Sequence, residues 1–285
     1  KSAAQQRRGH QVSIDSAARC ISAKEPRLNG KKGHVPVDCG EDAFFLTMPH
    51  SVSCCFLGVA DGVGGWSDMG IDPALFAWDL MKSCSAEAKV DSLEVPAGKC
   101  VDPKRLLTKS FNTSLDTGKM SYGSSTACVA TLDCTTAKLE VANLGDSGLM
   151  VVRDKSFALQ TREQHHSFNC PYQLVCNPPG HPEAGDSPEE ADKYSVQVKD
   201  GDLVLIGTDG FFDNVPKKDV LRLIAAMKEH KAHAAEIADA LVKYAHKKSL
   251  QTTGYSPFAS AAQSHGYDYE GGKQDDITLV VAQIS

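Results

Sequence analysis

Five acidic positions in this sequence stand beside small residues at the ends of apolar segments. They are Glu41-Asp42, Asp61, Asp146, Asp209 and Asp275-Asp276. One carboxylate next to a glycine is typical of an ordinary turn. Five such positions favour a different interpretation, because strand ends in one sheet layer can converge in space. Clustered carboxylates repel one another and are costly to bury unless hard divalent cations lie between them.

The chemistry predicted by such a cluster is metal-assisted hydrolysis. Mg²⁺ and Mn²⁺ prefer carboxylate and carbonyl oxygens, and waters complete their octahedral coordination. Two such ions about 4 Å apart can share one water, lower its pKa and direct it at phosphorus.

The apolar periodicity predicts the elements that position these residues. Helices are expected to begin at Asp72-Pro73 and Asp102-Pro103, because Pro suits the first helical position. A further helical pattern, in two pieces, covers residues 217–248. Strands are expected at 44–48, 51–60, 126–132, 138–142, 148–152, 195–198, 203–207 and 277–284, with 195–198 and 203–207 forming a hairpin. This order predicts an α+β layered domain.

Composition limits the possible functions. The chain has 285 residues, is 41% hydrophobic and carries a net charge of −6. An acidic chain without a basic stripe disfavours a nucleic-acid partner, and no apolar stretch approaches the roughly 20 residues of a membrane span. The ten cysteines contain no CxxC pair. We expect Cys54, Cys55, Cys84 and Cys128 to be buried small hydrophobes rather than a disulfide framework, which favours a reducing compartment.

Two segments depart from the regular pattern. Residues 1–24 carry five basic residues and one acidic residue, which is typical of either the end of an organelle transit peptide or a disordered basic terminus. Residues 160–193 contain five prolines and no sustained period, so we expect a functional loop. The expected organisation is an N-terminal extension (1–37) and one catalytic domain (38–285) with a flap-like loop at about 160–193.

Six motifs carry a family resemblance. In chain order they are GEDA (40–43), ADGVGG (60–65), GSSTA (123–127), NLGDSG (143–148), TDGFFD (208–213) and QDDIT (274–278). Their order and spacing resemble those of the metal-dependent serine/threonine phosphatases of type 2C, over about residues 38–284. The stretches QHHSFNCPYQL, YSPFASAA and GGKQDDIT are similar to the branch named after T-cell activation protein phosphatase, whose members are often mitochondrial.

The resemblance implies a fold, a reaction and a set of metal ligands. The fold is a four-layer α/β/β/α sandwich of two antiparallel sheets, with a dimetal cleft at one edge. The reaction is hydrolysis of phosphoserine and phosphothreonine in proteins, by in-line attack of a metal-activated bridging water and without a covalent phospho-enzyme. Asp61 would bridge two Mg²⁺ or Mn²⁺ ions, and the Gly62 carbonyl would bind one of them. Asp209 and Asp275 would hold the first ion.

The remaining acidic positions complete that set. Glu41 and Asp42 would bind the second ion directly or through waters, and Asp146 and Asp213, with Asp209, match a third, weaker metal site. Gly123 to Thr126 would shape the strand near the cluster. Substrate contacts are assigned to His165, His166 and Arg162 in the flap region.

Two departures from the family pattern concern the phosphate and the leaving group. Many relatives have a His after the Asp-Gly as a candidate general acid, and Val63 occupies that place here. Many also carry an Arg four residues before the Glu as a phosphate clamp, where this chain has Val37. His34, Lys31, Lys32 and Arg162 are candidate replacements, and a metal-bound water could protonate the leaving group. We expect the chemistry to survive, with slower turnover or narrower substrate choice.

The alternatives come from other classes. GDSG at 145–148 resembles the nucleophile region of trypsin-like proteases, but it leads directly into an apolar strand. A two-metal nuclease would use similar carboxylates. The main non-enzyme alternative is a catalytically weak pseudophosphatase that acts as a binding or scaffold module. The expected partners are phosphoproteins, without nucleic acid or a membrane span. We expect a monomer, located inside the cell in mitochondria or cytoplasm.

Overall fold

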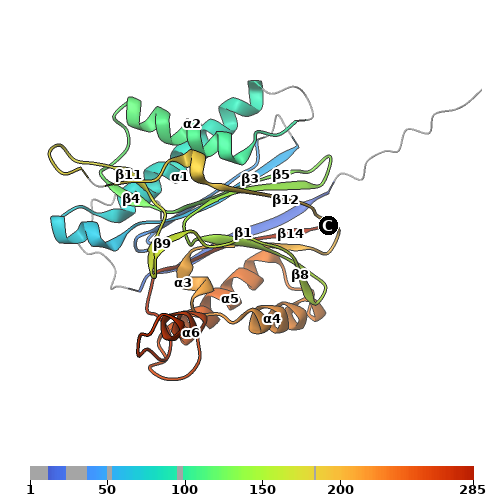
Figure 1. Cartoon of the computed structure of the whole chain (residues 1–285). Helices are drawn as coiled ribbons and strands as arrows, with labels where there is room; N and C mark the ends of the chain where they lie inside the picture. The colour runs from blue at the N-terminus through green and yellow to red at the C-terminus, as the bar shows by residue number, and fades with distance from the viewer. Residues whose placement is uncertain (1–11, 24–36, 50–52, 95–98, 183) are drawn as a thin grey trace, which may run out of the picture.

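The apolar segments form two five-stranded antiparallel sheets, stacked face to face between two layers of helices (Figure 1). The structure, a computed structural model, describes residues 12–23, 37–49, 53–94, 99–182 and 184–285. The expectation of an α+β sandwich of two antiparallel sheets is therefore confirmed.

The first sheet has the strand order β12-β6-β5-β3-β2. Its strands are β2 (Asp42–Thr47), β3 (Cys54–Asp61), β5 (Ala127–Asp133), β6 (Lys138–Leu144) and β12 (Asp192–Gln197). β3 is buried along nearly its whole length, because helices cover one face of the sheet and the second sheet covers the other.

The second sheet has the order β1-β14-β13-β7-β8. Its strands are β1 (Ile14–Ile21), β7 (Gly148–Arg153), β8 (Ser156–Gln160), β13 (Leu203–Gly207) and β14 (Ile277–Ile284). β14 lies between β1 and β13 and is antiparallel to both.

Helices cover the outer face of each sheet (Figure 1). The helices are α1 (Pro73–Glu94), α2 (Pro103–Asp116), α3 (Asp209–Phe212), α4 (Lys217–Glu229), α5 (Ala234–Ser249) and α6 (Pro257–Ser264). α1 and α2 pack on the first sheet, and α3, α4 and α5 pack on the second. The carboxylate of Asp102 caps α2 by accepting from the backbone N–H of Arg105 at 3.0 Å, as the Asp-Pro sequence predicts.

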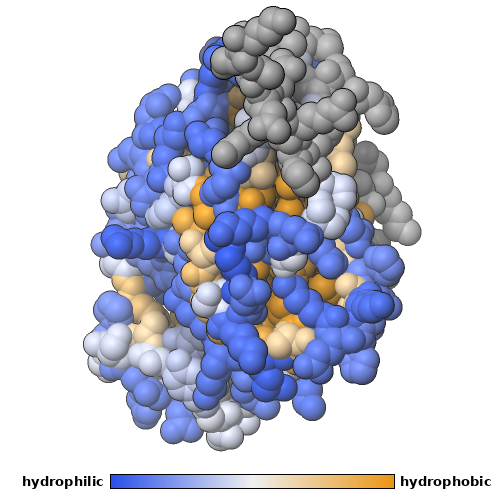
Figure 2. Space-filling model, turned by 90° about the vertical axis from the view of Figure 1, so that its right-hand side faces the viewer, coloured by the Kyte–Doolittle hydropathy of each residue, from blue (hydrophilic) through white to orange (hydrophobic). Residues whose placement is uncertain are grey.

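Apolar side chains fill all three interfaces between the layers. Phe76 and Leu107 lie under the first helical layer, Leu57 and Val280 lie between the sheets, and Leu241 lies under the second helical layer. Figure 2 shows one end of the sandwich, where apolar residues are visible in the middle of the face with hydrophilic residues around them. None of the helices in the described residues is both long and apolar enough to cross a bilayer.

Short elements occupy the predicted flap region and its neighbours. They are β4 (Gly123–Ser125), β9 (His165–Ser167), β10 (Cys170–Pro171), β11 (Leu174–Cys176) and the 3-10 helices η1 (Gly64–Met69) and η2 (Pro188–Glu190). β11 pairs with β4, so the flap is tied to the GSSTA segment.

Two sequence predictions about the chain's organisation need correction. Residues 195–198 and 203–207 do not form a hairpin, because β12 pairs with β6 in one sheet and β13 pairs with β14 and β7 in the other. The segment 1–37 is not wholly an extension, because β1 forms an edge strand of the second sheet.

The expectation about the cysteines is correct for three of the four positions named. Cys55, Cys84 and Cys128 are buried and unbonded. Cys54 is buried but forms a disulfide with Cys100. A second disulfide joins Cys20 and Cys39, because the end of β1 lies beside the segment that leads into β2. The sequence spacing gave no sign of either pair.

Candidate metal centre

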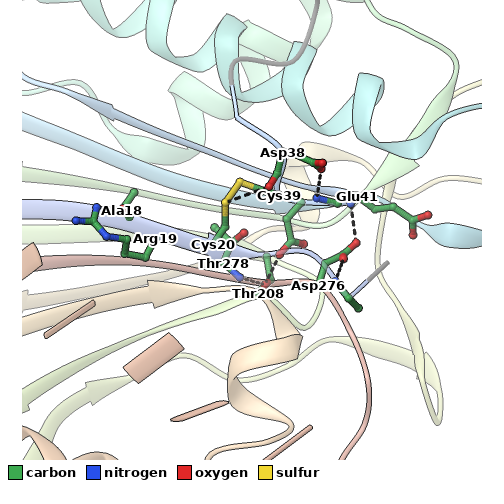
Figure 3. The surroundings of a disulfide bond; sticks show 12 residues. Ala18, Arg19, Cys20, Asp38, Cys39, Glu41, Thr208, Asp276 and Thr278 are labelled. Atoms are coloured by element: carbon green, nitrogen blue, oxygen red, sulfur yellow. Dashed lines mark hydrogen bonds between the residues drawn. A yellow bond between two sulfur atoms is a disulfide. The ribbon is translucent and has the colours of Figure 1, made fainter. Parts of the chain in front are cut away.

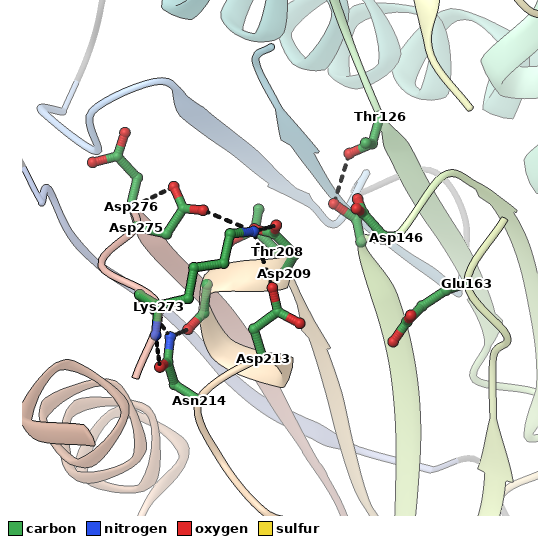
Figure 4. Close-up of polar contacts among 12 residues, drawn as sticks. Thr126, Asp146, Glu163, Thr208, Asp209, Asp213, Asn214, Lys273, Asp275 and Asp276 are labelled. Atoms are coloured by element: carbon green, nitrogen blue, oxygen red, sulfur yellow. Dashed lines mark hydrogen bonds and ion pairs between the residues drawn. The ribbon is translucent and has the colours of Figure 1, made fainter. Parts of the chain in front are cut away.

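Four of the predicted acidic residues converge at one edge of the sandwich. Asp42 begins β2 and lies opposite Asp61, the last residue of β3, in the antiparallel register. Asp209 begins α3 directly after β13, and Asp275 lies just before β14 (Figure 4). The strand ends of both sheets thus supply the cluster, as the carboxylates at the ends of apolar segments predict.

The cluster also contains a cation that the sequence reasoning missed. The Lys273 ammonium donates to the carboxylate of Asp209, to Asp213 Oδ2 at 3.0 Å, and forms an ion pair with Asp275 Oδ2 at 3.1 Å (Figure 4). Asn214 fixes the backbone of this lysine. Its amide donates to the Lys273 carbonyl at 2.8 Å and accepts from the Lys273 N–H at 3.0 Å.

Burial raises the pKa of several carboxyls in the cluster. The pKa values of Asp42, Asp61 and Asp213 lie well above the ordinary value, first through burial and then through neighbouring carboxylates. Burial and the charge of Asp209 raise the pKa of Asp275 to about 7. Burial alone would raise the pKa of Asp209 too, but Lys273 and hydrogen bonds to the carboxylate hold it below its usual value. The cluster thus has a surplus of negative charge that further cations would relieve.

The donor set fits divalent cations. Asp42 Oδ1 and Asp209 Oδ1 are buried and have no hydrogen-bond partner. Buried carboxylate oxygens are normally paired or coordinate metals, and all these donors are hard oxygens of the kind that Mg²⁺ and Mn²⁺ prefer. Within the described part of the chain, no three acidic, His or Cys side chains are already arranged to hold a metal. The Lys273 ammonium lies among the carboxylates instead.

Two glycines allow the backbone to approach this cluster closely. A Cβ on Gly62 would lie 2.7 Å from the carbonyl oxygens of both Glu41 and Pro73. Gly40 has a positive φ of 70°, and a Cβ there would lie 2.0 Å from Cγ of Asp276. Only glycine fits at either position without movement of its neighbours.

Glu41 is held in place by a residue to which the sequence assigned no role. Asp276 accepts from the Glu41 N–H at 2.6 Å and from the Ala23 N–H at 2.7 Å, so it ties the GED segment to the end of β1 (Figure 3). The disulfide between Cys20 and Cys39 links the same two segments. Together these contacts fix the backbone that presents Glu41 and Asp42.

Hydroxyl groups support the other two strand ends. Thr208 donates to Asp42 Oδ2 at 2.8 Å. Thr126, at the end of the GSSTA segment, accepts from the Asp61 N–H at 3.2 Å and shares a 2.7 Å hydrogen bond with Ser147. Ser147 therefore supports the strand that carries Asp61. The hydrogen bonds of Thr126 agree with the expected role of residues 123–126.

The residues predicted for a third metal lie on either side of a small cavity. Asp146 and Asp213 both line this space of about 260 Å³, together with His165. His165 Nε2 lies 3.2 Å from Asp146 Oδ2, and this hydrogen bond raises the pKa of the imidazole. Burial raises the pKa of Asp146. Glu163 also lines the cavity and lies across from Asp213 (Figure 4).

The other predicted substrate contacts have different surroundings. His166 hydrogen-bonds Asp186 at 3.0 Å and stacks on Tyr172, and both of these residues belong to the flap. The backbone N–H of Arg162 donates to the hydroxyl of Tyr194 at 3.0 Å. Val37 is exposed, and the Val63 N–H donates to the Ser124 carbonyl at 3.0 Å. The proposed replacements Lys31, Lys32 and His34 lie outside the described residues.

An aromatic cluster joins the flap to the segment around α6. Phe168, between β9 and β10, contacts the rings of Phe258, His265 and Tyr267 at centroid distances of 5.4, 4.9 and 5.1 Å. Phe168, Phe258 and His265 also line the 260 Å³ cavity. The flap is thereby held next to the acidic cluster. A larger and more apolar cavity of about 490 Å³ lies on the other side of Asp146.

Comparison with known proteins decides the family. The family model described as Stage II sporulation protein E (SpoIIE) matches residues 53–285. The protein phosphatase PTC7 homolog fig of Drosophila erecta is 39% identical over 269 residues, which cover 92% of this chain and 81% of that protein. The chain belongs to the type 2C family of protein phosphatases. It is a protein serine/threonine phosphatase, and phosphoproteins are its class of substrate.

Solved structures agree with this assignment of the phosphatase. The photosystem II phosphatase PBCP is 31% identical to it, with a TM-score of 0.78 over 96% of this chain and 99% of that chain. The catalytic domain of the serine/threonine phosphatase PstP, solved in complex with two manganese ions, is 16% identical. It superimposes with a TM-score of 0.57 over 96% of this chain and 99% of that one, which shows the shared fold.

Proposed function

We propose that this phosphatase hydrolyses phosphoserine and phosphothreonine with two divalent cations, Mg²⁺ or Mn²⁺, at the edge of the sandwich. Asp61 would bridge the two ions, Asp209 and Asp275 would hold the first, and Glu41 and Asp42 the second. The observation that carries this proposal is the convergence of four carboxylates, with Asp42 Oδ1 and Asp209 Oδ1 buried and unpartnered.

The chain's own residues position the donors and the substrate. When bound, the ions supply an activated water near neutral pH. The carbonyl of Gly62 is available as a further ligand, and Thr208 orients the carboxylate of Asp42. Asp146 and Asp213, with Asp209, would form a weaker third site beside the 260 Å³ cavity. His165 lines the same cavity and is the flap residue best placed to contact substrate.

This chain lacks the His and the Arg that serve many relatives as candidate proton donor and phosphate clamp. Val63 cannot donate a proton, and Val37 cannot bind a phosphate. We therefore propose slower turnover or narrower substrate choice than in relatives that carry His and Arg at these positions. Val63→His and Val37→Arg, made together, should raise turnover of a small aryl phosphate. Unchanged turnover in this double variant would contradict the proposal.

The scaffold alternative is not favoured. A pseudophosphatase would be expected to lack one of the central carboxylates, whereas Asp61, Asp209 and Asp275 are all present. The sequence relative is itself named as a protein phosphatase.

The decisive experiment is hydrolysis of p-nitrophenyl phosphate and of phosphopeptides with added Mn²⁺ or Mg²⁺. We expect activity that a chelator abolishes and that Asp209→Ala loses. Asp239→Ala is the matched control, because Asp239 forms an exposed ion pair with Lys243 on α5, at 2.7 Å. This variant should remain active. Activity without metal, or undiminished activity of Asp209→Ala, would refute the metal assignment. Inactivity of folded, metal-loaded protein on both substrates would support the scaffold alternative.

We further propose that the protein acts inside the cell as a monomer, in mitochondria or in the cytoplasm. The branch resemblance supports the mitochondrial location. Part of the basic segment 1–24 belongs to the folded domain, because residues 14–21 form β1. Residues 1–11 of that segment lie outside the described part of the chain. Import of a fluorescent fusion into mitochondria would test the compartment, and light scattering would test the oligomeric state.

A further inference from the structure

Lys273 is the residue of the acidic cluster for which the family resemblance supplies no role. Its side chain is 16% exposed, and its ammonium contacts the carboxylates of Asp209, Asp213 and Asp275. Its backbone is held on both sides by the amide of Asn214. The position of the lysine is thus defined by the backbone, while its four-carbon side chain can reach more than one partner.

The oxygens that accept from this ammonium are oxygens that the proposed first metal needs. Asp209 and Asp275 are the ligands assigned to that ion, and both are paired with Lys273. A Mg²⁺ ion requires ligand oxygens at about 2.0–2.1 Å in near-octahedral geometry. An ammonium and a divalent cation cannot occupy the same place between two carboxylates, and their like charges repel. Metal binding therefore has to move the Lys273 ammonium.

A second partner for the ammonium lies beside the first. Lys273 Nζ is 5.1 Å from the centroid of the Phe258 ring, a distance at which a cation is attracted to the ring face. Phe258 lines the 260 Å³ cavity together with Asp146, Asp213 and His165. An ammonium that leaves Asp209 and Asp275 on this side faces the space next to the metal ligands. A phosphate group bound in this space would lie beside Asp146 and Asp213 and within reach of the displaced ammonium.

We propose that Lys273 is an internal counter-ion of the acidic cluster, that metal binding displaces it, and that the displaced ammonium binds the phosphate group of the substrate. This proposal rests on the metal ligands assigned above. It gives the chain a phosphate-binding cation although Val37 replaces the common Arg. It also makes metal affinity weaker than the carboxylates alone would give, because each metal ion competes with a cation that is already bound.

The first test separates this role from a purely structural one. Lys273→Met, Lys273→Arg and the control Lys243→Met are compared by thermal unfolding in chelator and in Mn²⁺, and by calorimetric titration with Mn²⁺. Lys243 suits the control because it pairs with one exposed carboxylate on α5, away from the cluster. In chelator, Lys273→Met should melt at a lower temperature than the wild type. It should bind Mn²⁺ about tenfold more tightly or better, because the Lys273 ammonium no longer competes for the oxygens of Asp209 and Asp275.

The metal-induced rise in Tm is consequently larger in Lys273→Met than in the wild type. Lys273→Arg keeps the competing charge, so its Mn²⁺ affinity should stay near that of the wild type. Lys243→Met should leave both quantities unchanged. An equal loss of Tm with and without Mn²⁺, together with an unchanged Mn²⁺ affinity, would overturn the counter-ion role.

The second test addresses the phosphate. At saturating Mn²⁺, Lys273→Met should raise KM for p-nitrophenyl phosphate and weaken inhibition by inorganic phosphate about tenfold, with a smaller change in kcat. Lys273→Arg, which keeps the positive charge, should have a KM and a phosphate inhibition close to those of the wild type. Unchanged KM and unchanged phosphate inhibition would overturn the phosphate-binding role.

A further variant, Asp209→Asn, distinguishes the two proposals. If it binds Mn²⁺ as the wild type does, the metal assignment itself fails. If it loses Mn²⁺ while Lys273→Met binds Mn²⁺ like the wild type, only the role of Lys273 fails.

Discussion

Replacing Gly62 with alanine tests how closely the backbone must approach the acidic cluster. The added methyl group would lie 2.7 Å from two carbonyl oxygens and 2.9 Å from the carbonyl carbon of Pro73. All three are backbone atoms, at the start of α1 and beside the GED segment, so no side chain can move away to make room. Overpacking of this kind costs about 1–3 kcal/mol, and we expect the upper end. At about 2–4 °C per kcal/mol for a domain of this size, Tm should fall by roughly 6–12 °C.

The assay is thermal unfolding with and without Mn²⁺, followed by phosphatase activity of the folded variant at low temperature. Gly65→Ala in the same motif is the matched control, because its Cβ would meet nothing within 4 Å. The control should stay within about 0.5 kcal/mol of the wild type, as surface substitutions usually do. Gly62→Ala should also lose activity, since its methyl group displaces the segment that carries Glu41. If the two variants melt at the same temperature and are equally active, the close approach at Gly62 is not required.

Three further outcomes follow from other parts of the structure. The pKa of Asp275, about 7 in the folded chain, exceeds the unfolded value of about 3.9. Between these pH values the folded state therefore binds more protons than the unfolded state, and Tm in chelator should fall as the pH rises from about 4 to about 7. Saturating Mn²⁺ should reduce this dependence of Tm on pH. A Tm in chelator that does not change with pH would contradict the raised pKa of Asp275. Phe168→Ala removes the ring that joins the flap to the α6 segment. We expect KM for a phosphopeptide to rise several-fold, while the free energy of unfolding falls by at most about 1–2 kcal/mol. An unchanged KM would show that the flap does not need this aromatic contact. Asp202→Ala removes the carboxylate that accepts two hydrogen bonds from the Arg153 guanidinium, at 2.9 and 2.6 Å. The free energy of unfolding should fall by about 2–3 kcal/mol, because Arg153 is only partly buried. Lys138→Met, in an exposed pair, should lower it by less than about 1 kcal/mol, and equal denaturation midpoints for the two variants would refute this difference between buried and exposed pairs.

The sequence predicted the acidic half of the site and missed its cation. Asp42, Asp61, Asp209 and Asp275 could be found because a carboxylate at the end of an apolar strand is a local pattern, and strand ends meet at a sheet edge. Lys273 stands in a polar stretch without periodicity, and its partner Asp209 lies 64 residues away. Nothing in the neighbourhood of a single lysine predicts a contact of that kind.

The same distinction between local and distant information explains the errors in the fold. β12 and β13 resemble a hairpin because a short polar segment separates them, yet their partners β6 and β14 come from other parts of the chain. β1 has a weak apolar pattern, with Ala17, Ala18 and Arg19 at its centre, and it is held by pairing along its full length with β14. Strand pairing depends on residues that the local window does not contain.

The central place of β14 has a consequence for the making of this protein. Ile14 of β1 pairs with Ile284, and β13 also pairs with β14. During synthesis, β1 therefore cannot pair with β14 until some 260 further residues have been translated (Ile21 pairs with Ile277). Such non-local pairing slows folding. Because Asp275 comes immediately before β14, the acidic cluster is completed only at the same late moment. A nascent chain cannot assemble the centre early, so an incompletely synthesised phosphatase should have no activity on the proteins around it.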